Sequence, residues 1–383
     1  MVRISKDQPE AKDSNKPTEE RKVTIQIIDD ENLRKHLTDP LFNTLVLSST
    51  NIYGADFSIL KTFPNLETLL ISNAILHSSL LPLLSSIKNL KNLRLGACDL
   101  TSSSVIQEIA SKEGLREISI TSCKGVIRSD LTPLGESLLL CKIRLWNNGL
   151  TKLSLDFVKP LSELRFLSLS SNPIRSIDLD PLSSCTELRE LELDEMHISE
   201  IDLSPLASCK RIEYLSLASN RLSEIDLMPL SGSEIQEIHL YNNELRTVDL
   251  SPLSECHQLT RLLIRNNKMT EIDLSPLSEC RNLRYLNFGG NRLTNIDLFP
   301  LSKCLSLDHL LLRGNRLTSM DLSPLSPCRN LEHLNISENR LTTVNLTPLA
   351  ECKELKTLNL EGNKIKDLDT SPLESSRFLD IKW

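Results

Sequence analysis

A repeat with a period of about 24 residues runs through most of this sequence of 383 residues. Aligning the chain with itself places an apolar residue at the first position of fourteen repeats, spaced 23 to 25 residues apart. The first positions are Phe42, Leu66, Leu90, Leu115, Leu140, Leu164, Leu188, Ile212, Ile235, Leu259, Leu283, Leu307, Leu331 and Leu355. A single repeat buries too little apolar surface to offset its conformational entropy, so the repeats must stack on one another.

The repeat that begins at Leu283 shows the internal pattern. Positions 1, 4, 6, 11, 14, 16 and 19 are apolar, position 9 is Asn291, and position 22 is Cys304. The alternation around positions 4 and 6 predicts a strand, and one strand per repeat predicts a parallel sheet. Ser-Pro-Leu at positions 17 to 19, as in 204–206, predicts a short helix or 3₁₀ turn with Ser as its N-cap and Pro at its first position.

This pattern resembles that of the leucine-rich-repeat superfamily, L-x-x-L-x-L-x-x-N/C-x-L. The resemblance implies an α/β solenoid of about 14 repeats, a horseshoe with a concave parallel β-sheet and short helices or 3₁₀ turns on the convex side. The regular Asp-Leu-Ser-Pro-Leu and Cys pattern is similar to that of cytoplasmic leucine-rich-repeat proteins of prokaryotes, archaea included. The first four repeats depart from it, with Thr50, Ala74, Cys98 and Cys123 at position 9.

The ends of the chain lack the repeat. Residues 1–22 are charged and poor in apolar residues, which indicates a disordered tail. Residues 23–41 predict an N-terminal cap made of a strand and a short helix, residues 42–378 carry the repeats, and residues 379–383 predict a C-terminal edge strand. We expect a monomer, with an edge-to-edge dimer through the C-terminal rung as the alternative.

Composition limits the classes of function. The sequence has a net charge of −7, no run of 18 apolar residues and no apolar signal core at its start, so we expect no membrane span, no export and a cytoplasmic location. Seven of its ten cysteines occupy position 22 and no CxxC pair exists, which predicts buried free thiols rather than disulfides or a zinc site. The seven are Cys185, Cys209, Cys256, Cys280, Cys304, Cys328 and Cys352.

No catalytic motif is present: the chain has no P-loop, nucleophile elbow or HExxH sequence, so we expect neither an enzyme nor a cofactor. Two features leave a metal site open as the less favoured alternative. A carboxylate recurs at position 15, from Asp178 to Asp369, and is expected to bond local backbone rather than calcium. His309 and His333 lie one rung apart and are expected to be ordinary surface histidines.

A column of basic residues occupies position 10 and is unbroken from Lys268 to Lys364. It indicates either a solvated, partly paired edge or a ridge that binds anions. The ridge supports an alternative function, that of an anionic-polymer or nucleic-acid binder, against which the acidic net charge counts.

Positions 3, 5 and 7 must face the inner side of the sheet, because positions 4 and 6 face the core. Folding requires no aromatic residues there, whereas protein interfaces favour Tyr, Trp and Arg. The predicted partner-binding residues are Trp146, Phe166, Glu190, Glu192, Asp194, Tyr214, His239, Tyr241, Arg261, Arg265, Tyr285, His309, Arg313 and His333. Together with the resemblance, they favour a non-enzymatic scaffold or regulatory adaptor that holds a partner protein; a regulatory subunit of an enzyme such as a phosphatase is a further alternative.

Overall fold

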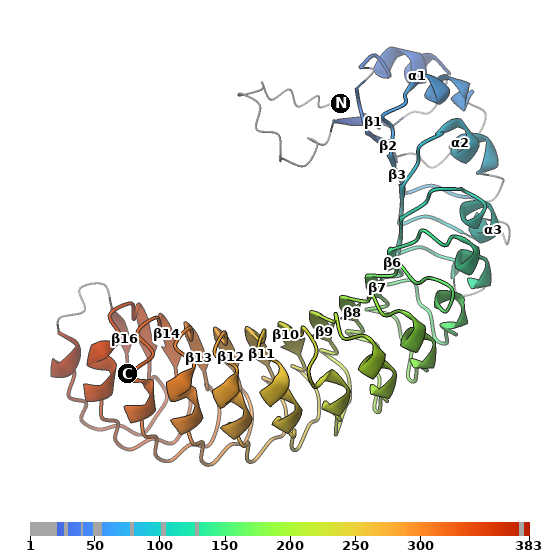
Figure 1. Ribbon diagram of the computed structural model, residues 1–383. Coiled ribbons are helices and arrows are strands. Elements are labelled where there is room, and N and C mark those ends of the chain that lie inside the picture. Colours follow the sequence, from blue (N-terminus) through green and yellow to red (C-terminus); the bar gives the residue numbers. More distant parts are fainter. Residues whose placement is uncertain are drawn as a thin grey trace. The chain divides into compact units, whose positions relative to one another are not determined.

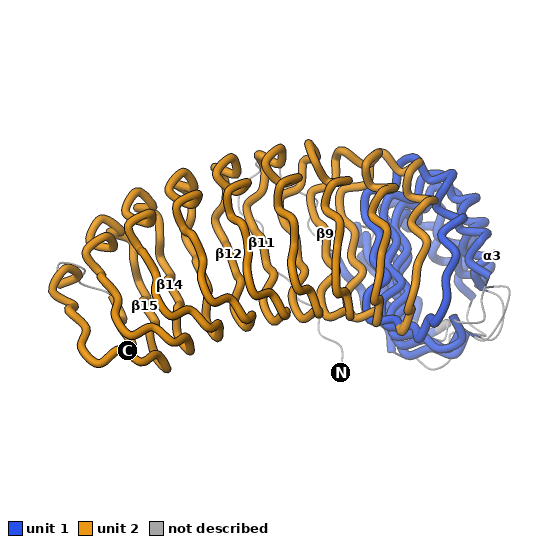
Figure 2. The backbone as a smooth tube through the Cα atoms, turned by 90° about the horizontal axis from the view of Figure 1, so that it is seen from below, with its two compact units in different colours: residues 1–172 blue, residues 173–383 orange. Residues whose placement is uncertain are grey.

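The computed structural model describes residues 21–26, 30–39, 41–48, 56–76, 80–100, 105–126, 130–374 and 379–383. The chain divides into two compact units, residues 1–172 (unit 1) and 173–383 (unit 2), coloured separately in Figure 2. Most of the expected tail, residues 1–20, and Thr50 lie outside the described residues.

Unit 1 contains the repeats with the least regular sequences. Its strands are parallel and follow chain order: β1 Lys22–Ile25, β2 Thr44–Ser48, β3 Thr68–Ser72, β4 Asn92–Gly96, β5 Glu117–Thr121, β6 Lys142–Arg144 and β7 Phe166–Ser168. The segments between them are α1 Asp30–His36, η1 Phe57–Thr62, α2 Leu81–Ser86, α3 Val105–Ala110, η3 Thr132–Glu136 and η4 Asp156–Val158, where η marks a 3₁₀ helix. True α-helical turns therefore occur where the Ser-Pro-Leu sequence is missing or altered.

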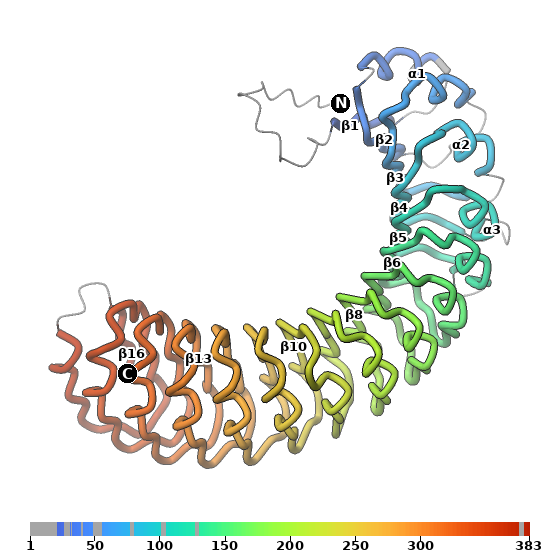
Figure 3. Tube along the Cα trace, viewed as in Figure 1, coloured from blue at the N-terminus to red at the C-terminus, as the bar shows by residue number. Residues whose placement is uncertain are grey.

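Unit 2 is more regular. Its parallel strands are β8 Glu190–Glu192, β9 Tyr214–Ser216, β10 Glu237–His239, β11 Arg261–Leu263, β12 Tyr285–Asn287, β13 His309–Leu311, β14 His333–Asn335, β15 Thr357–Asn359 and β16 Asp380–Lys382. The 3₁₀ turns are η5 Asp180–Ser184, η6 Ser204–Ser208, η7 Met228–Leu230, η8 Ser251–Glu255, η9 Ser275–Glu279, η10 Phe299–Lys303, η11 Ser323–Leu325, η12 Thr347–Glu351 and η13 Ser371–Leu373. Within unit 2 the strands lie on one side and the 3₁₀ turns on the other (Figures 1 and 3).

The register of the strands fixes which side chains face outward. In β10 and β11, Ile238 pairs with Leu262, and both side chains have no exposed surface. Their neighbours at positions 3 and 5 point to the opposite side, because successive side chains in a strand alternate. We call this surface of unit 2, formed by positions 3, 5 and 7, the strand face.

Asparagine at position 9 forms a buried ladder between repeats. The Asn291 side-chain nitrogen donates to the carbonyl oxygens of Ile264 and Phe288, each at 3.0 Å, and its oxygen accepts from the Met269 N–H at 3.2 Å. Its neighbours Asn267 and Asn315 make the same contacts one repeat away. These bonds satisfy backbone groups of the turn that leaves each strand, as the sequence predicts, and satisfied backbone groups are what burial of this turn requires.

The 3₁₀ turns begin differently from the prediction. At η6 the N-cap is Leu203, and Ser204 and Pro205 are the first two residues of the turn, so Ser is not the cap. The Asp202 carboxylate accepts a hydrogen bond from the Ser204 N–H at 2.8 Å instead. A carboxylate two residues before the Ser can accept the Ser N–H through an unstrained local turn. The Ser side chain is then not needed as a cap, and Ser becomes the first residue of the 3₁₀ turn.

Candidate functional site

The strand face of unit 2 presents one continuous column of position-3 side chains. Parallel pairing places Glu190 beside Tyr214, Tyr214 beside Glu237, and each following position-3 residue beside the next. The column continues through Arg261, Tyr285, His309, His333 and Thr357. The structure therefore brings twelve of the fourteen predicted residues onto this face, all but Trp146 and Phe166.

A first aromatic group, the Tyr214 cluster, consists of Tyr214, His239, Tyr241 and Arg265. The Tyr214 hydroxyl lies 2.9 Å from His239 Nδ1, and the two ring centroids are 4.9 Å apart. The His239 and Tyr241 centroids are 5.9 Å apart, and the Arg265 guanidinium lies 4.4 Å from the centre of the Tyr241 ring. The cluster is a partly buried, hydrogen-bonded platform of rings.

Burial changes the titration of this cluster. It raises the pKa of Tyr214 to about 12. It also lowers the pKa of His239, even though Glu237 Oε2 lies 3.2 Å from Nε2 and favours the charged ring. Both groups are therefore neutral at pH 7, which suits a surface that contacts apolar or aromatic side chains.

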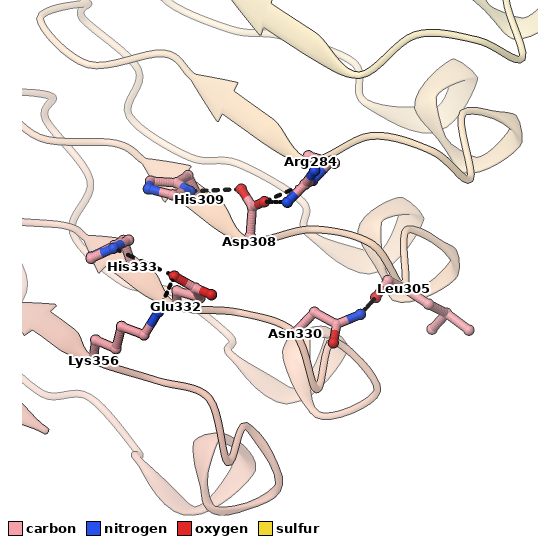
Figure 4. A network of polar contacts seen from close by, with 8 residues as sticks. All are labelled: Arg284, Leu305, Asp308, His309, Asn330, Glu332, His333 and Lys356. Atoms are coloured by element: carbon pink, nitrogen blue, oxygen red, sulfur yellow. Dashed lines mark hydrogen bonds and ion pairs between the residues drawn. The ribbon is translucent and has the colours of Figure 1, made fainter. Parts of the chain in front are cut away.

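A second aromatic group, the Tyr285 row, consists of Arg261, Tyr285, His309 and His333. The Arg261 guanidinium lies 5.0 Å from the Tyr285 ring centre, Tyr285 stacks on His309 at 4.9 Å, and His309 lies 4.4 Å from His333. Figure 4 shows how acidic residues hold the two imidazoles. Asp308 Oδ1 lies 2.6 Å from His309 Nδ1 while its other oxygen binds Arg284 at 2.8 Å.

A shallow hollow of about 320 Å³ lies beside the Tyr285 row. It is lined by His309, Leu311, His333, Asn335, Thr357, Leu358, Asn359, Asp380 and Lys382. The His333 ring bonds Thr357 Oγ1 through Nδ1 at 2.8 Å, and burial and the neighbouring His309 lower the pKa of His333. The hollow is lined by an acidic residue, a basic residue and several neutral polar side chains. It lies on the strand face and reaches from β13 to β16.

The acidic residues differ in their exposure. Glu190 is exposed, whereas Asp194 is partly buried and accepts hydrogen bonds from the Ser216 hydroxyl and, at 2.7 Å, from the Ala218 N–H. Burial raises the pKa of Asp194 despite these bonds. Asp194 therefore fixes the turn after β8 and contributes less to the outer surface than its position predicts.

Two arginines of the face lie near acidic residues, and a third lies over an aromatic ring. Arg313 pairs with Glu338 at 2.7 Å, and Arg261 lies 3.9 Å from Glu237. Arg265 lies over the Tyr241 ring. The face thus presents mixed charges around its rings.

Trp146 and Phe166 belong to unit 1. Trp146 is 40% exposed, but Phe166 is only 6% exposed because Lys142 and Arg144 from the preceding strand cover its ring at 4.6 and 4.8 Å. The Phe166 ring therefore packs against two cationic side chains and is not available for contact with a partner. Sequence reasoning missed this arrangement, although the register places Lys142 directly beside Phe166 and Arg144 two residues further along the preceding strand.

The carboxylates of position 15 are occupied by local bonds. Each accepts from the N–H two residues later, as Asp249, Asp273 and Asp321 do with the serines that follow. These bonds lower the pKa of each of the three carboxyl groups. Within the described residues, no group of three or more His, Cys, Asp or Glu side chains is arranged to hold a metal ion.

The cysteines of position 22 form a buried column. All ten cysteines of the chain are free thiols. The Cys304 thiol donates to the Leu277 carbonyl of the preceding repeat at 3.3 Å, and Cys280 and Cys328 repeat this bond. Burial raises the pKa of Cys304 to about 11, so the column is protonated and unreactive.

No helix in the part of the chain that the structure describes has the length and apolarity to span a bilayer.

Comparison with known proteins agrees with this architecture. The leucine rich repeat family model matches residues 139–198, 257–317 and 305–365. No curated protein matches the sequence at a significant level.

Solved structures share the fold at low sequence identity. An internalin from Listeria monocytogenes is 24% identical, with 92% of this chain and 88% of that chain covered and a TM-score of 0.61. A leucine-rich-repeat protein of Leptospira interrogans is 18% identical, with 90% of both chains covered and a TM-score of 0.66. A chain of the Toll–Spätzle complex of Drosophila is 18% identical, with a TM-score of 0.71. The match covers 93% of this chain and 52% of that chain.

These likenesses concern the fold. The chain has the leucine-rich-repeat fold, and residues 139–198 and 257–365 carry repeats that match the leucine rich repeat family model.

Proposed function

We propose that this chain is a non-enzymatic scaffold or regulatory adaptor that holds a partner protein on the strand face of unit 2. Leucine-rich-repeat proteins generally mediate protein–protein interaction, and the Toll chain that shares this fold was solved in a complex with Spätzle. The observation that carries the proposal is the placement of the Tyr214 cluster and the Tyr285 row on an outward surface. The core of unit 2 is complete without them, since Leu, Ile and Phe residues fill it.

The chemistry of the face suits a protein surface. Tyrosine rings supported by arginine present large, rigid contact areas at a small cost in conformational entropy, and such residues dominate binding energy at interfaces. The stacked order Arg261, Tyr285, His309 holds these side chains in place before a partner arrives. Preorganisation of this kind reduces the entropy lost on binding.

The test is affinity capture from the source cell with three versions of the chain. Wild type and the single variant Phe299→Ser are expected to capture the same partner, because Phe299 is 70% exposed on the turn side and Ser is the usual residue there. The double variant Tyr241→Ala with Tyr285→Ala is expected to lose it while keeping its circular dichroism spectrum. Retention of the partner by the double variant would refute binding on the strand face.

We further propose a reducing compartment, the cytoplasm, as the site of action. The free, buried cysteine column supports this proposal, because an oxidising environment favours paired cysteines. Trapping thiols with acid and alkylating agent during cell lysis should label all ten cysteines after denaturation. Fewer labelled cysteines would argue for an oxidising location.

We also propose that the chain acts as a monomer. The strand β16 pairs with β15 and is the last strand in chain order, so it is the edge through which a second copy would add. Light scattering coupled to size exclusion should give a mass near 43.2 kDa. A mass of twice this value would favour the edge-to-edge dimer.

A further inference from the structure

A basic ridge runs along unit 2 on the turns that follow the strands. It consists of the position-10 residues of five consecutive repeats: Lys268, Arg292, Arg316, Arg340 and Lys364. The backbone fixes their spacing, because each position-10 N–H donates to the position-11 carbonyl of the preceding repeat. Arg292 donates to Met269 at 2.8 Å, Arg316 to Leu293 at 2.9 Å, and Arg340 to Leu317 at 2.8 Å. One cation is therefore held per repeat, in register.

Most cations of the ridge lack an acidic partner. Across the described part of the chain, Arg292, Arg316, Arg340 and Lys364 form no ion pair, and all four are exposed. Only Lys268 is paired, with Glu244 at 2.6 Å.

The position-2 column of the same solenoid is built in the opposite way. There acids and bases are mixed and pair between neighbouring repeats, as Arg284 does with Asp308 and Lys356 with Glu332 at 2.8 and 2.5 Å. Like charges on adjacent repeats repel each other, so a one-sign column is a cost to the folded chain that a bound anion removes. The contrast between the two columns indicates that the ridge has a ligand.

A hollow marks one end of the ridge. It has a volume of about 390 Å³ and is lined by Arg246, Lys268, Thr270 and Arg292, which come from three consecutive repeats. Two guanidinium groups, an ammonium group and a hydroxyl are all hydrogen-bond donors that suit a phosphate group. An exposed threonine at position 12 also accompanies Arg292, Arg316 and Arg340, and Lys366 occupies this position beside Lys364; the three threonines are Thr294, Thr318 and Thr342.

The composition of the ridge defines the class of ligand. Positions 10, 12 and 13 of the five repeats contain no aromatic residue, so nucleic-acid bases find no surface for stacking there. A single anion would fill the hollow and leave Arg316, Arg340 and Lys364 unpaired. We propose that the basic ridge is a binding site for a linear phosphate chain of the inorganic polyphosphate type, recognised by charge and by hydroxyl hydrogen bonds and independent of the strand face.

The experiment measures binding of long-chain inorganic polyphosphate to the full chain by biolayer interferometry at several salt concentrations. Wild type is expected to bind at about 50 mM NaCl, with the logarithm of affinity falling linearly as the logarithm of salt concentration rises. The ridge variant Arg292→Gln, Arg316→Gln and Arg340→Gln is expected to bind at least ~10-fold more weakly, with a salt slope reduced in magnitude by about 2 to 3.

A matched control removes the same charge elsewhere. Arg281, Arg329 and Lys353 are exposed residues at position 23, on the turn side, and their change to Gln is expected to leave polyphosphate binding within about twofold of wild type. Equal losses in both triple variants would overturn the site, because overall charge would then explain binding. Absence of wild-type binding would also overturn it, and tighter binding of an equally charged oligodeoxythymidylate would assign the ridge to nucleic acid instead. Melting temperatures no lower than that of wild type confirm that both variants fold.

Discussion

The hydroxyl of Tyr214 lies 2.9 Å from Nδ1 of His239, although the two residues are 25 positions apart in the chain. Tyr214 occupies position 3 of its repeat and His239 occupies position 5 of the next, so the bond crosses the sheet diagonally. It joins the two strands through their outer side chains and keeps both rings in place on the strand face.

Acidification should protonate His239 only at a pH below the range in which histidine ordinarily titrates. Burial lowers the pKa of His239 in the folded chain, so the unfolded chain binds the proton first as pH falls from 6.5. The contribution of His239 to folding free energy is therefore full above pH 6.5 and declines as pH falls from 6.5 toward the folded pKa. Nuclear magnetic resonance of the His239 ring should give a midpoint below 6.5. A midpoint above 6.5 would mean that Glu237 outweighs burial.

Asn291→Ala should destabilise unit 2 strongly. The substitution removes three buried hydrogen bonds, at a cost of about 2–4 kcal/mol in the free energy of unfolding. It takes the asparagine oxygen from the Met269 N–H and leaves the Ile264 and Phe288 carbonyl oxygens with one asparagine donor each instead of two. Urea denaturation followed by circular dichroism measures this. The control is Asn295→Ala, because Asn295 is exposed and its side chain accepts a local hydrogen bond from the adjacent Ile296 N–H. Equal effects from the two substitutions would contradict the role of the ladder.

Cys123→Asn should stabilise unit 1. Cys123 occupies position 9, and its sulfur accepts the Cys98 N–H at 3.3 Å, where asparagine oxygens accept the N–H of other repeats. Its own N–H already binds the Asn148 side chain at 2.9 Å, so an asparagine there joins an existing ladder. We expect a gain of about 1 kcal/mol in unfolding free energy by urea denaturation. A loss of stability would mean that the sulfur fits this site better than an amide.

Calcium should leave the melting temperature unchanged. The position-15 carboxylates are engaged with local N–H groups, as Asp273 is with Ser275. These bonds lower the pKa of Asp273, so its stabilising contribution is present above pH 3.8 and is lost as pH falls through the folded pKa. Differential scanning calorimetry with and without CaCl₂ tests the first statement. A rise of several degrees with calcium would restore the metal-binding interpretation.

The cysteine column should resist thiol reagents. Nine of the ten cysteines are buried, and Cys141 alone is partly exposed. Burial raises the pKa of Cys280 to about 12, which leaves almost no thiolate at neutral pH. Titration with a thiol reagent should therefore detect one reactive cysteine in the native chain and ten in denaturant. Rapid reaction of several cysteines in the native chain would contradict the column.

The sequence predicts the period, the strands and the buried positions well, because one chemical pattern recurs in every repeat. Leu286 is buried and Asn291 bonds the neighbouring repeat, as the equivalent residues of other repeats do. The structure of one repeat can therefore be predicted from the others. The outward positions of the strand face follow from this alternation. The cap of the 3₁₀ turn was predicted wrongly, because both Asp202 and Ser204 are suitable caps and only the backbone angles at Leu203 decide between them.

Side-chain contacts between neighbouring repeats could not be predicted from the sequence. Phe166 looked exposed by position, but the long side chains of Lys142 and Arg144 fold over its ring. Arg246 joins Lys268 and Arg292 around one hollow although it occupies position 12. Such contacts depend on side-chain length and direction across neighbouring strands, which a one-dimensional pattern does not contain.

Hydroxyl-radical footprinting of the complex shows which face of unit 2 the partner covers. Once a partner has been captured, hydroxyl-radical labelling of the free and bound chain measures which side chains the partner covers. We expect protection of Tyr241, Tyr285 and His309 on the strand face, with Phe299 on the turn side labelled equally in both states. Protection of Phe299 with unchanged labelling of the two tyrosines would contradict it.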